Sequence, residues 1–280
     1  MYLITGSKGQ LGTELSKLLP NAILTDVAEL DITNQDAVNS FVKANNIDTI
    51  INCAAYTAVD KAEEDKEVAY KINVTGPENL AKTGCKVVHV STDYVFDGTG
   101  HKPYQPSDDT HPVSVYGRTK LAGENAVLTN ASVAVVIRTA WLYSPYGNNF
   151  VKTMQRLGRE KTSINVVCDQ IGTPTYAADL AQAIVAIIPQ MNENNSGIYH
   201  YTNEGVCSWY DFAHEIIRLS SLDCKVLPIP SSAYPTKATR PFYSVLDKTK
   251  IKTTFGLSIS HWQDSLVKCI KQLENNNNEN

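Results

Sequence analysis

Two sets of residues in this sequence have the types and spacing needed for chemistry on a nucleotide cofactor. The first is Gly6, Gly9 and Gly12, which recur at every third position directly after a short apolar run. Between a strand and a helix, such a loop offers backbone N–H groups and the positive end of the helix dipole to a pyrophosphate. Asp26 ends the second expected strand, where a carboxylate can accept hydrogen bonds from an adenosine ribose. The pattern predicts a dinucleotide site, and a tight turn without a ligand is the alternative.

The second set is Tyr116 and Lys120, which lie at positions i and i+4 and so share one face of a helix expected over 114–128. An unperturbed phenol has a pKa of about 10, which a neighbouring ammonium lowers because it favours the phenolate. We therefore expect Lys120 to lower the pKa of Tyr116, which can then donate its proton to a developing alkoxide. Lys120 can also hold the hydroxyls of a nicotinamide ribose. Taken alone the pair is a weak signal, because an exposed Tyr and a solvated Lys at this spacing are common.

The elements that would position these residues alternate regularly over the first half of the chain. Short apolar segments predict strands, and longer segments with apolar residues at helical spacing predict helices. The expected strands are 2–5, 22–26, 48–55, 86–92 and 132–140, and the expected helices are 9–19, 32–46, 64–84 and 114–128. This alternation is typical of βαβ units. It predicts an α/β fold with a Rossmann-type, doubly wound parallel sheet and a smaller C-terminal substrate-binding region.

Beyond position 140 the alternation gives way to helices separated by short strands and proline-rich loops such as "LPIPSSAYPTKATRPFY". Helices are expected over 148–160, 177–188, 208–221 and 261–274. We predict a dinucleotide-binding domain over 1–145, to which later strands and helices return. A mainly substrate-binding region is expected over 146–274, and a polar, disordered tail over 275–280.

Composition excludes several classes of protein. Of the 280 residues 42% are hydrophobic and 19% are charged, with a net charge of -4 and scattered lysines and arginines, so no basic face for nucleic acid is expected. No apolar run reaches the length of about 18 residues that spans a bilayer. The six cysteines form no C-x-x-C pair. We expect a cytoplasmic protein with reduced thiols that binds neither nucleic acid nor membrane.

Several stretches together resemble the dTDP-4-dehydrorhamnose reductase family, in the extended branch of the short-chain dehydrogenase/reductase superfamily. They are "NCAAYTAVDKAEED" (52–65), "STDYVFDG" (91–98), "YGRTKLAGE" (116–124), "RTAWLYSPYGNNFVKTM" (138–154), "DQIGTPTYAADLA" (169–181) and "RPFYSVLDKTK" (240–250). The spacing of the first two glycines is also similar to that superfamily. The resemblance implies an enzyme that transfers a hydride from NADPH or NADH to the 4-keto group of dTDP-4-dehydro-6-deoxy-L-mannose, giving dTDP-L-rhamnose.

The same resemblance implies roles for individual residues. Thr92, Tyr116 and Lys120 would be catalytic, with the Thr92 hydroxyl on the substrate carbonyl and Ser91 turned toward the core or a neighbouring strand. The cofactor-binding residues would be Gly6, Gly9, Gln10, Leu11, Gly12, Asp26, Asp31, Ile32, Ala54, Ala55, Thr57, Tyr116 and Lys120. Thr92, Asp93, Trp141 and Arg240 would bind substrate, with Trp141 as a flat wall and Arg240 on the diphosphate. The simpler alternatives are a turn cap for Asp93, a core position for Trp141 and an exposed position for Arg240.

Cofactor choice and metal binding stay open at this point. Asp26 favours a free ribose 2′-hydroxyl and hence NADH, whereas Lys8 could meet a 2′-phosphate; we place NADPH first. Some family members form magnesium-bridged dimers. Glu14 matches one acidic ligand, but Ala178 stands at the position of another, with Asp179 adjacent. A site with so few carboxylates would bind a hard cation only weakly. We therefore expect no metal, and either a monomer or a homodimer that does not depend on a metal.

Two other functions compete with the reductase. A nucleotide-sugar epimerase or dehydratase of the same superfamily would recycle its nicotinamide, but Tyr94 stands where a dehydratase usually places an acid after the Thr-Asp pair. The regulatory subunit of methionine adenosyltransferase resembles this family and acts by binding a partner. The presence of Thr92, Tyr116 and Lys120 argues against that non-catalytic role.

Overall fold

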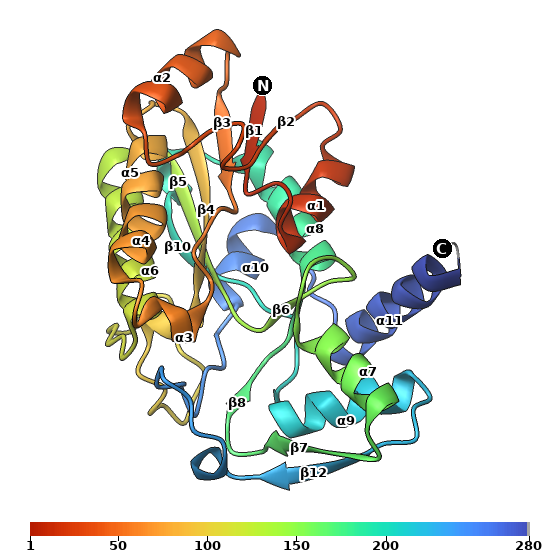
Figure 1. Ribbon diagram of the computed structural model, residues 1–280. Helices are drawn as coiled ribbons and strands as arrows, with labels where there is room; N and C mark the ends of the chain where they lie inside the picture. The colour runs from red at the N-terminus through yellow and green to blue at the C-terminus, as the bar shows by residue number, and fades with distance from the viewer. Residues whose placement is uncertain (279–280) are drawn as a thin grey trace.

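A parallel sheet of six strands forms the centre of the molecule (Figure 1), in a computed structural model that describes residues 1–278. The strands are β1 (Tyr2–Thr5), β2 (Ile23–Thr25), β3 (Thr49–Asn52), β4 (Lys86–Thr92), β5 (Ala134–Thr139) and β10 (Gly197–His200). They lie in the order β10, β5, β4, β3, β1, β2, and each neighbouring pair is parallel. The chain reverses direction across the sheet between β1 and β3, and ligands bind at such a switch point, outside the carboxyl ends of the strands.

Helices cover both faces of this sheet (Figure 1). α1 (Gln10–Leu18), α8 (Ala177–Ile187) and α10 (Thr249–Phe255) lie on one face, and α2 (Gln35–Ala44), α5 (Gly76–Ala81) and α6 (Val115–Asn130) lie on the other. Successive residues of a strand point to opposite faces. Thus Ile4 and Ile51 pack in the core beneath α1 and α8, whereas Leu3 and Ile50 pack beneath α2. The central strands β1, β3, β4 and β5 are largely buried on both sides, which explains their nearly continuous apolar runs and confirms the predicted fold class.

A smaller second core lies below the sheet in Figure 1. It contains α7 (Phe150–Glu160), α9 (Trp209–Leu219) and α11 (Trp262–Asn278), together with β7 (Ser163–Val167) paired in parallel with β12 (Lys225–Ile229). Short pairs join β6 (Leu142–Tyr143) to β9 (Thr175–Tyr176) and β8 (Ile171–Gly172) to β11 (Cys207–Ser208). Among residues 1–278, no helix has both the length and the apolar character needed to cross a bilayer.

Two segments differ from the sequence-based expectation. The helix expected over 64–84 is divided into α4 (Lys66–Tyr70), a π-helical turn over Lys71–Thr75, and α5. The turn contains the fully buried Asn73, whose side chain bonds the backbone of Tyr56 at 2.8 and 3.2 Å. Such local widening re-aims a side chain within a helix. α11 continues to Asn278, so residues 275–278 of the expected tail are helical, and residues 279–280 lie outside the described part of the chain.

Candidate active site

A cleft of about 790 Å³ opens at the carboxyl edge of the sheet. It is lined by sixteen of the seventeen predicted site residues: Gly6, Gly9, Gln10, Leu11, Gly12, Asp26, Asp31, Ile32, Ala54, Ala55, Thr57, Thr92, Asp93, Tyr116, Lys120 and Trp141. Arg240 is not among the lining residues. Chain segments as far apart as the glycine loop, the end of β4 and the start of α6 therefore meet in one site.

The three glycines have different structural reasons for being glycine. Gly6 has a φ of 64°, and a Cβ there would lie 2.7 Å from the backbone nitrogen of Ala54. A Cβ on Gly12 would lie 2.3 Å from the Gly6 carbonyl oxygen, so this glycine lets α1 approach the loop. Gly9 is less crowded, since a Cβ would meet only that same oxygen, at 3.2 Å.

Gly9 also caps α1 without a side-chain acceptor, so the N–H groups of the first turn remain for another partner. The pyrophosphate of a dinucleotide fits this place. Gly9 leaves space for it, the N-terminus of α1 has no side-chain cap, and the loop lies at the switch point of the sheet.

Carboxylates surround the end of the cleft beside β2. Asp26 accepts a hydrogen bond from the Val27 N–H at 2.9 Å, and its other oxygen lies 3.4 Å from the Lys8 N–H. The ammonium of Lys8 pairs with Glu29 at 3.0 Å, and the second Glu29 oxygen accepts from the backbone of Asp26 at 2.8 Å. Lys8 is therefore held by Glu29, an acid that the sequence analysis did not identify. Asp31 accepts hydrogen bonds from the backbone N–H and the hydroxyl of Thr33.

The predicted catalytic residues lie where β4 ends and α6 begins. Thr92 is buried, donates to the Asp93 carboxylate at 3.0 Å and accepts from the Tyr94 N–H at 3.2 Å. Its hydroxyl also lies near enough to the Tyr116 hydroxyl to oppose a rise in the pKa of that phenol. The ring of Tyr94 meets the ring of Tyr116 edge-on, with centroids 5.5 Å apart. Lys120 is buried one helical turn deeper, and its ammonium donates to the Val90 carbonyl at 2.7 Å.

The pKa of Tyr116 is raised, not lowered as expected from the sequence. Burial is the largest cause, and the nearby Asp93 and Tyr94 add to the rise. The ammonium of Lys120 does not offset this, because it is directed at the Val90 carbonyl. Burial lowers the pKa of Lys120 to about 8, while the negative charge of Glu124 opposes that fall. Burial also raises the pKa of Asp93 to about 6.

Beneath these residues lies a fully buried ion pair that connects α6 to the sheet. The Arg138 guanidinium on β5 donates to the Glu124 carboxylate at 2.7, 3.0 and 3.2 Å, and both side chains are at most 2% exposed. Ser91 donates to the same carboxylate from β4, so it faces inward as expected. Glu124 lies one turn beyond Lys120 on α6, and the ion pair therefore holds this helix against both strands.

Trp141 and Arg240 differ in their relation to the cleft. Trp141 lines it with a φ of 50°, a strained conformation for a bulky residue, and stacks on Trp209 with centroids 3.6 Å apart. Arg240, in contrast, forms an ion pair of 2.6 Å with Asp60 and donates to the Tyr94 hydroxyl at 3.1 Å. The guanidinium therefore has an internal carboxylate partner and reaches the cleft only through Tyr94.

Two acids considered as metal ligands have protein partners. Glu14 is buried, and one of its oxygens pairs with Lys17 at 3.2 Å. Asp179 is also buried and accepts hydrogen bonds from Asn203 and Ser265. Within residues 1–278, no group of three or more His, Cys, Asp or Glu side chains is placed to hold a metal ion.

Comparison with known proteins gives the family. The protein-family model described as "RmlD substrate binding domain" matches residues 1–275 of this chain. A dTDP-4-dehydrorhamnose reductase from Aggregatibacter actinomycetemcomitans is 44% identical, over 94% of this chain and 96% of the relative. The chain belongs to the dTDP-4-dehydrorhamnose reductase family. This confirms the resemblance found in the sequence, and with it an enzyme that uses a nicotinamide cofactor.

Solved structures of family members superimpose over nearly their whole length. A reductase from Clostridium acetobutylicum is 47% identical and has a TM-score of 0.94, covering 98% of this chain and 99% of that one. A reductase from Bacillus anthracis, solved in complex with NADP, is 39% identical with a TM-score of 0.93, covering 97% and 98%. The family fold thus extends through both the large sheet and the smaller core.

Proposed function

We propose that this protein reduces the 4-keto group of dTDP-4-dehydro-6-deoxy-L-mannose to give dTDP-L-rhamnose. The observation that carries the proposal is that Thr92, Tyr116 and Lys120 line one cleft with the glycine loop, in a chain whose residues 1–275 match the family model. NADPH or NADH, when bound, supplies the hydride. We also propose that the sheet domain over 1–145 holds the cofactor and that 146–274 mainly holds the nucleotide sugar.

The protonation states suit reduction of a ketone. The raised pKa makes the Tyr116 phenol a weaker acid that keeps its proton at neutral pH, but an alkoxide is a stronger base than a phenolate and can still take this proton as it forms on the carbonyl oxygen. Thr92 lies beside Tyr116, and its hydroxyl, which donates to Asp93 in this structure, supplies a second donor to the same oxygen once it turns toward the substrate. Lys120, with a pKa of about 8, is mostly charged at neutral pH and can hold ribose hydroxyls.

A direct test follows the cofactor and the sugar in the same reaction. Purified protein is mixed with NADPH and the dTDP-4-keto sugar, nicotinamide oxidation is followed by absorbance, and the sugar product is identified by NMR. Oxidation equal to the amount of sugar reduced is expected, and Tyr116→Phe should lower turnover by about 10²–10⁴ while NADPH affinity stays near that of the wild type. Sugar converted without net NADPH oxidation would instead establish an epimerase or dehydratase. Cofactor binding without any turnover would favour a non-catalytic, partner-binding role.

For assembly and location, we propose a cytoplasmic monomer, or a homodimer that is not bridged by magnesium. The support is that Glu14 pairs with Lys17, that Asp179 is bonded to Asn203 and Ser265, and that Ala178 provides no ligand. Magnesium at Glu14 would have to share the carboxylate with the Lys17 ammonium, which pairs with one of its oxygens.

A further inference from the structure

The loop over 144–149 forms one wall of the cofactor cleft. It follows β6 and leads into α7, and Gly147, Asn148 and Asn149 are among the lining residues. The Asn149 side-chain amide donates to the Ser144 carbonyl at 2.7 Å and to the Gln10 side-chain oxygen at 3.0 Å. Gln10 is the first residue of α1, at the site proposed for the pyrophosphate. The loop and the phosphate-binding helix are therefore bonded to each other at the cleft.

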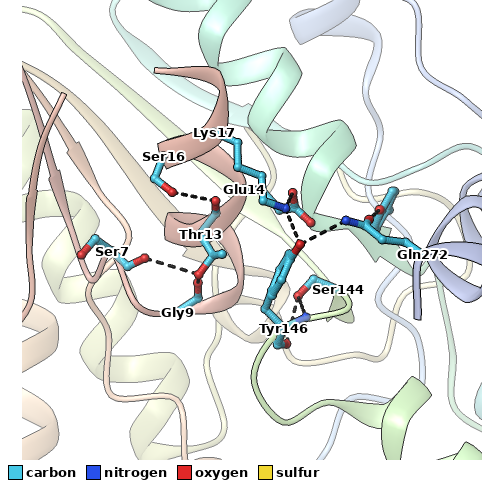
Figure 2. A network of polar contacts seen from close by, with 10 residues as sticks. Ser7, Gly9, Thr13, Glu14, Ser16, Lys17, Ser144, Tyr146 and Gln272 are labelled. Atoms are coloured by element: carbon cyan, nitrogen blue, oxygen red, sulfur yellow. Dashed lines mark hydrogen bonds and ion pairs between the residues drawn. The ribbon is translucent and has the colours of Figure 1, made fainter. Parts of the chain in front are cut away.

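A second connection joins the same loop and helix (Figure 2), through side chains that do not line the cleft. The Lys17 ammonium, in the last turn of α1, contacts the Tyr146 hydroxyl and lies 4.0 Å from the centre of the Tyr146 ring. It also pairs with Glu14 at 3.2 Å. The Gln272 amide on α11 donates to the same Tyr146 hydroxyl at 3.1 Å, and its oxygen accepts from Tyr176 at 3.0 Å. We call Lys17, Tyr146 and Gln272 the clasp.

Charge and burial favour a persistent clasp. Glu14 is only 5% exposed and carries one oxygen, Oε1, without a hydrogen-bond partner. Burial alone would lower the pKa of Lys17, but its hydrogen bond to Tyr146 and the charge of Glu14 outweigh this and raise it. The ammonium therefore stays charged at neutral pH. Neither Lys17 nor Tyr146 lines the cleft, so any effect on the cofactor must act through the loop.

We propose that Lys17 and Tyr146 are positioning residues for cofactor binding. The clasp holds the back of the 144–149 loop against α1 and α11, which keeps Asn149 in place to orient the Gln10 side chain at the cleft. Loop residues held this way lose little further freedom when the dinucleotide binds, and such preorganisation favours affinity. The C-terminal helix is thereby connected to a cleft that it does not line. The inference rests on the proposed cofactor site but not on the identity of the sugar.

The test measures cofactor binding without catalysis. Tyr146→Phe removes the hydroxyl and keeps the ring, and Lys17→Met removes the ammonium. Each should raise the Kd for NADPH about three- to tenfold by fluorescence titration, with kcat at saturating NADPH within about twofold of the wild type. The double variant should be no weaker than the weaker single variant, because both remove one connection. Lys17→Arg, which keeps the charge, should bind within about twofold of the wild type.

Lys82→Met is the matched control, since it removes an exposed ion pair with Glu78 on α5, far from the loop in sequence. It should leave the Kd unchanged. A lower melting temperature of the clasp variants with an unchanged Kd would overturn the proposal and leave the clasp a purely structural contact. So would effects that multiply in the double variant. Wild-type protein that binds NADPH but does not reduce the keto sugar would refute the proposed function alone. Wild-type protein that binds neither nicotinamide cofactor would refute both.

Discussion

The buried carboxyl of Asp93 should make stability depend on pH in a way that an asparagine abolishes. The Asp93 side chain is only 3% exposed. Its Oδ1 accepts a hydrogen bond from Thr92, whereas its Oδ2 has no hydrogen-bond partner. The nearby Ser244 hydroxyl opposes the rise of the Asp93 pKa but does not cancel it. Burial raises the pKa from 3.8 to about 6. This corresponds to a destabilisation of about 3 kcal/mol once the group is ionised in both the folded and unfolded states.

The sign follows from proton binding. Between about pH 4 and pH 6 the folded state binds more protons at Asp93 than the unfolded state, so this group lowers the free energy of unfolding as pH rises. Asp93→Asn has no such group. The unfolding free energy of the variant minus that of the wild type should therefore increase by about 3 kcal/mol over the whole window, and by about 1.5 kcal/mol between pH 5 and pH 7.5. Other titrating groups are present in both proteins and cancel.

Urea unfolding of both proteins, followed by tryptophan fluorescence at about pH 5 and about pH 7.5, measures this difference. Asp223→Asn, which removes an exposed carboxyl, is the control for the loss of one negative charge. The hydrogen-bonding cost of the new amide affects both pH values alike, so it does not obscure the result. A difference for Asp93→Asn that is constant within about 0.5 kcal/mol would refute the inference that the carboxyl is destabilised by burial.

Other predictions concern the loop, the buried ion pair, cofactor choice and metal. Gly9→Val should weaken NADPH binding at least about tenfold in titration, because the side chain occupies the place where the pyrophosphate approaches the backbone. Circular dichroism should stay native, because only one backbone oxygen lies near an added Cβ. Unchanged affinity would mean that the loop is only a turn. Glu124→Gln should lower the unfolding free energy by about 3–5 kcal/mol by leaving the Arg138 charge unpaired, and combining it with Arg138→Met should restore most of this; a double variant as unstable as the single would contradict it. Glu29→Gln frees Lys8 and should lower the ratio of the NADPH Kd to the NADH Kd about two- to fivefold, and an unaltered ratio would exclude this pair as a determinant. EDTA should change neither turnover nor particle size, whereas loss of both, reversed by magnesium, would show a metal-bridged dimer.

Local sequence patterns were enough to predict the fold class and the main constellation. The alternation of apolar strands and amphipathic helices depends on backbone periodicity, which neighbouring residues specify. The glycine loop and the Tyr116–Lys120 spacing are local too, since one turn and one helix face determine them. Because the carboxyl ends of parallel strands share one edge, residues predicted at those ends could be expected to meet, and in the structure they line one cleft. The family was likewise recognisable from stretches that remain contiguous in the chain.

Tertiary packing decided what the charged groups do. Lys120 bonds to the Val90 carbonyl on β4, and desolvation raises the pKa of Tyr116 although the two residues are only four positions apart on α6. Arg240 is paired with Asp60, which lies 180 positions earlier in the chain and which no local pattern connects to it. The contact of Lys17 with Tyr146, 129 positions away, is of the same kind. Burial and partners across such separations arise only when distant segments pack. The sequence therefore predicted residues that line the cleft, with Arg240 as the exception, but not their electrostatic state.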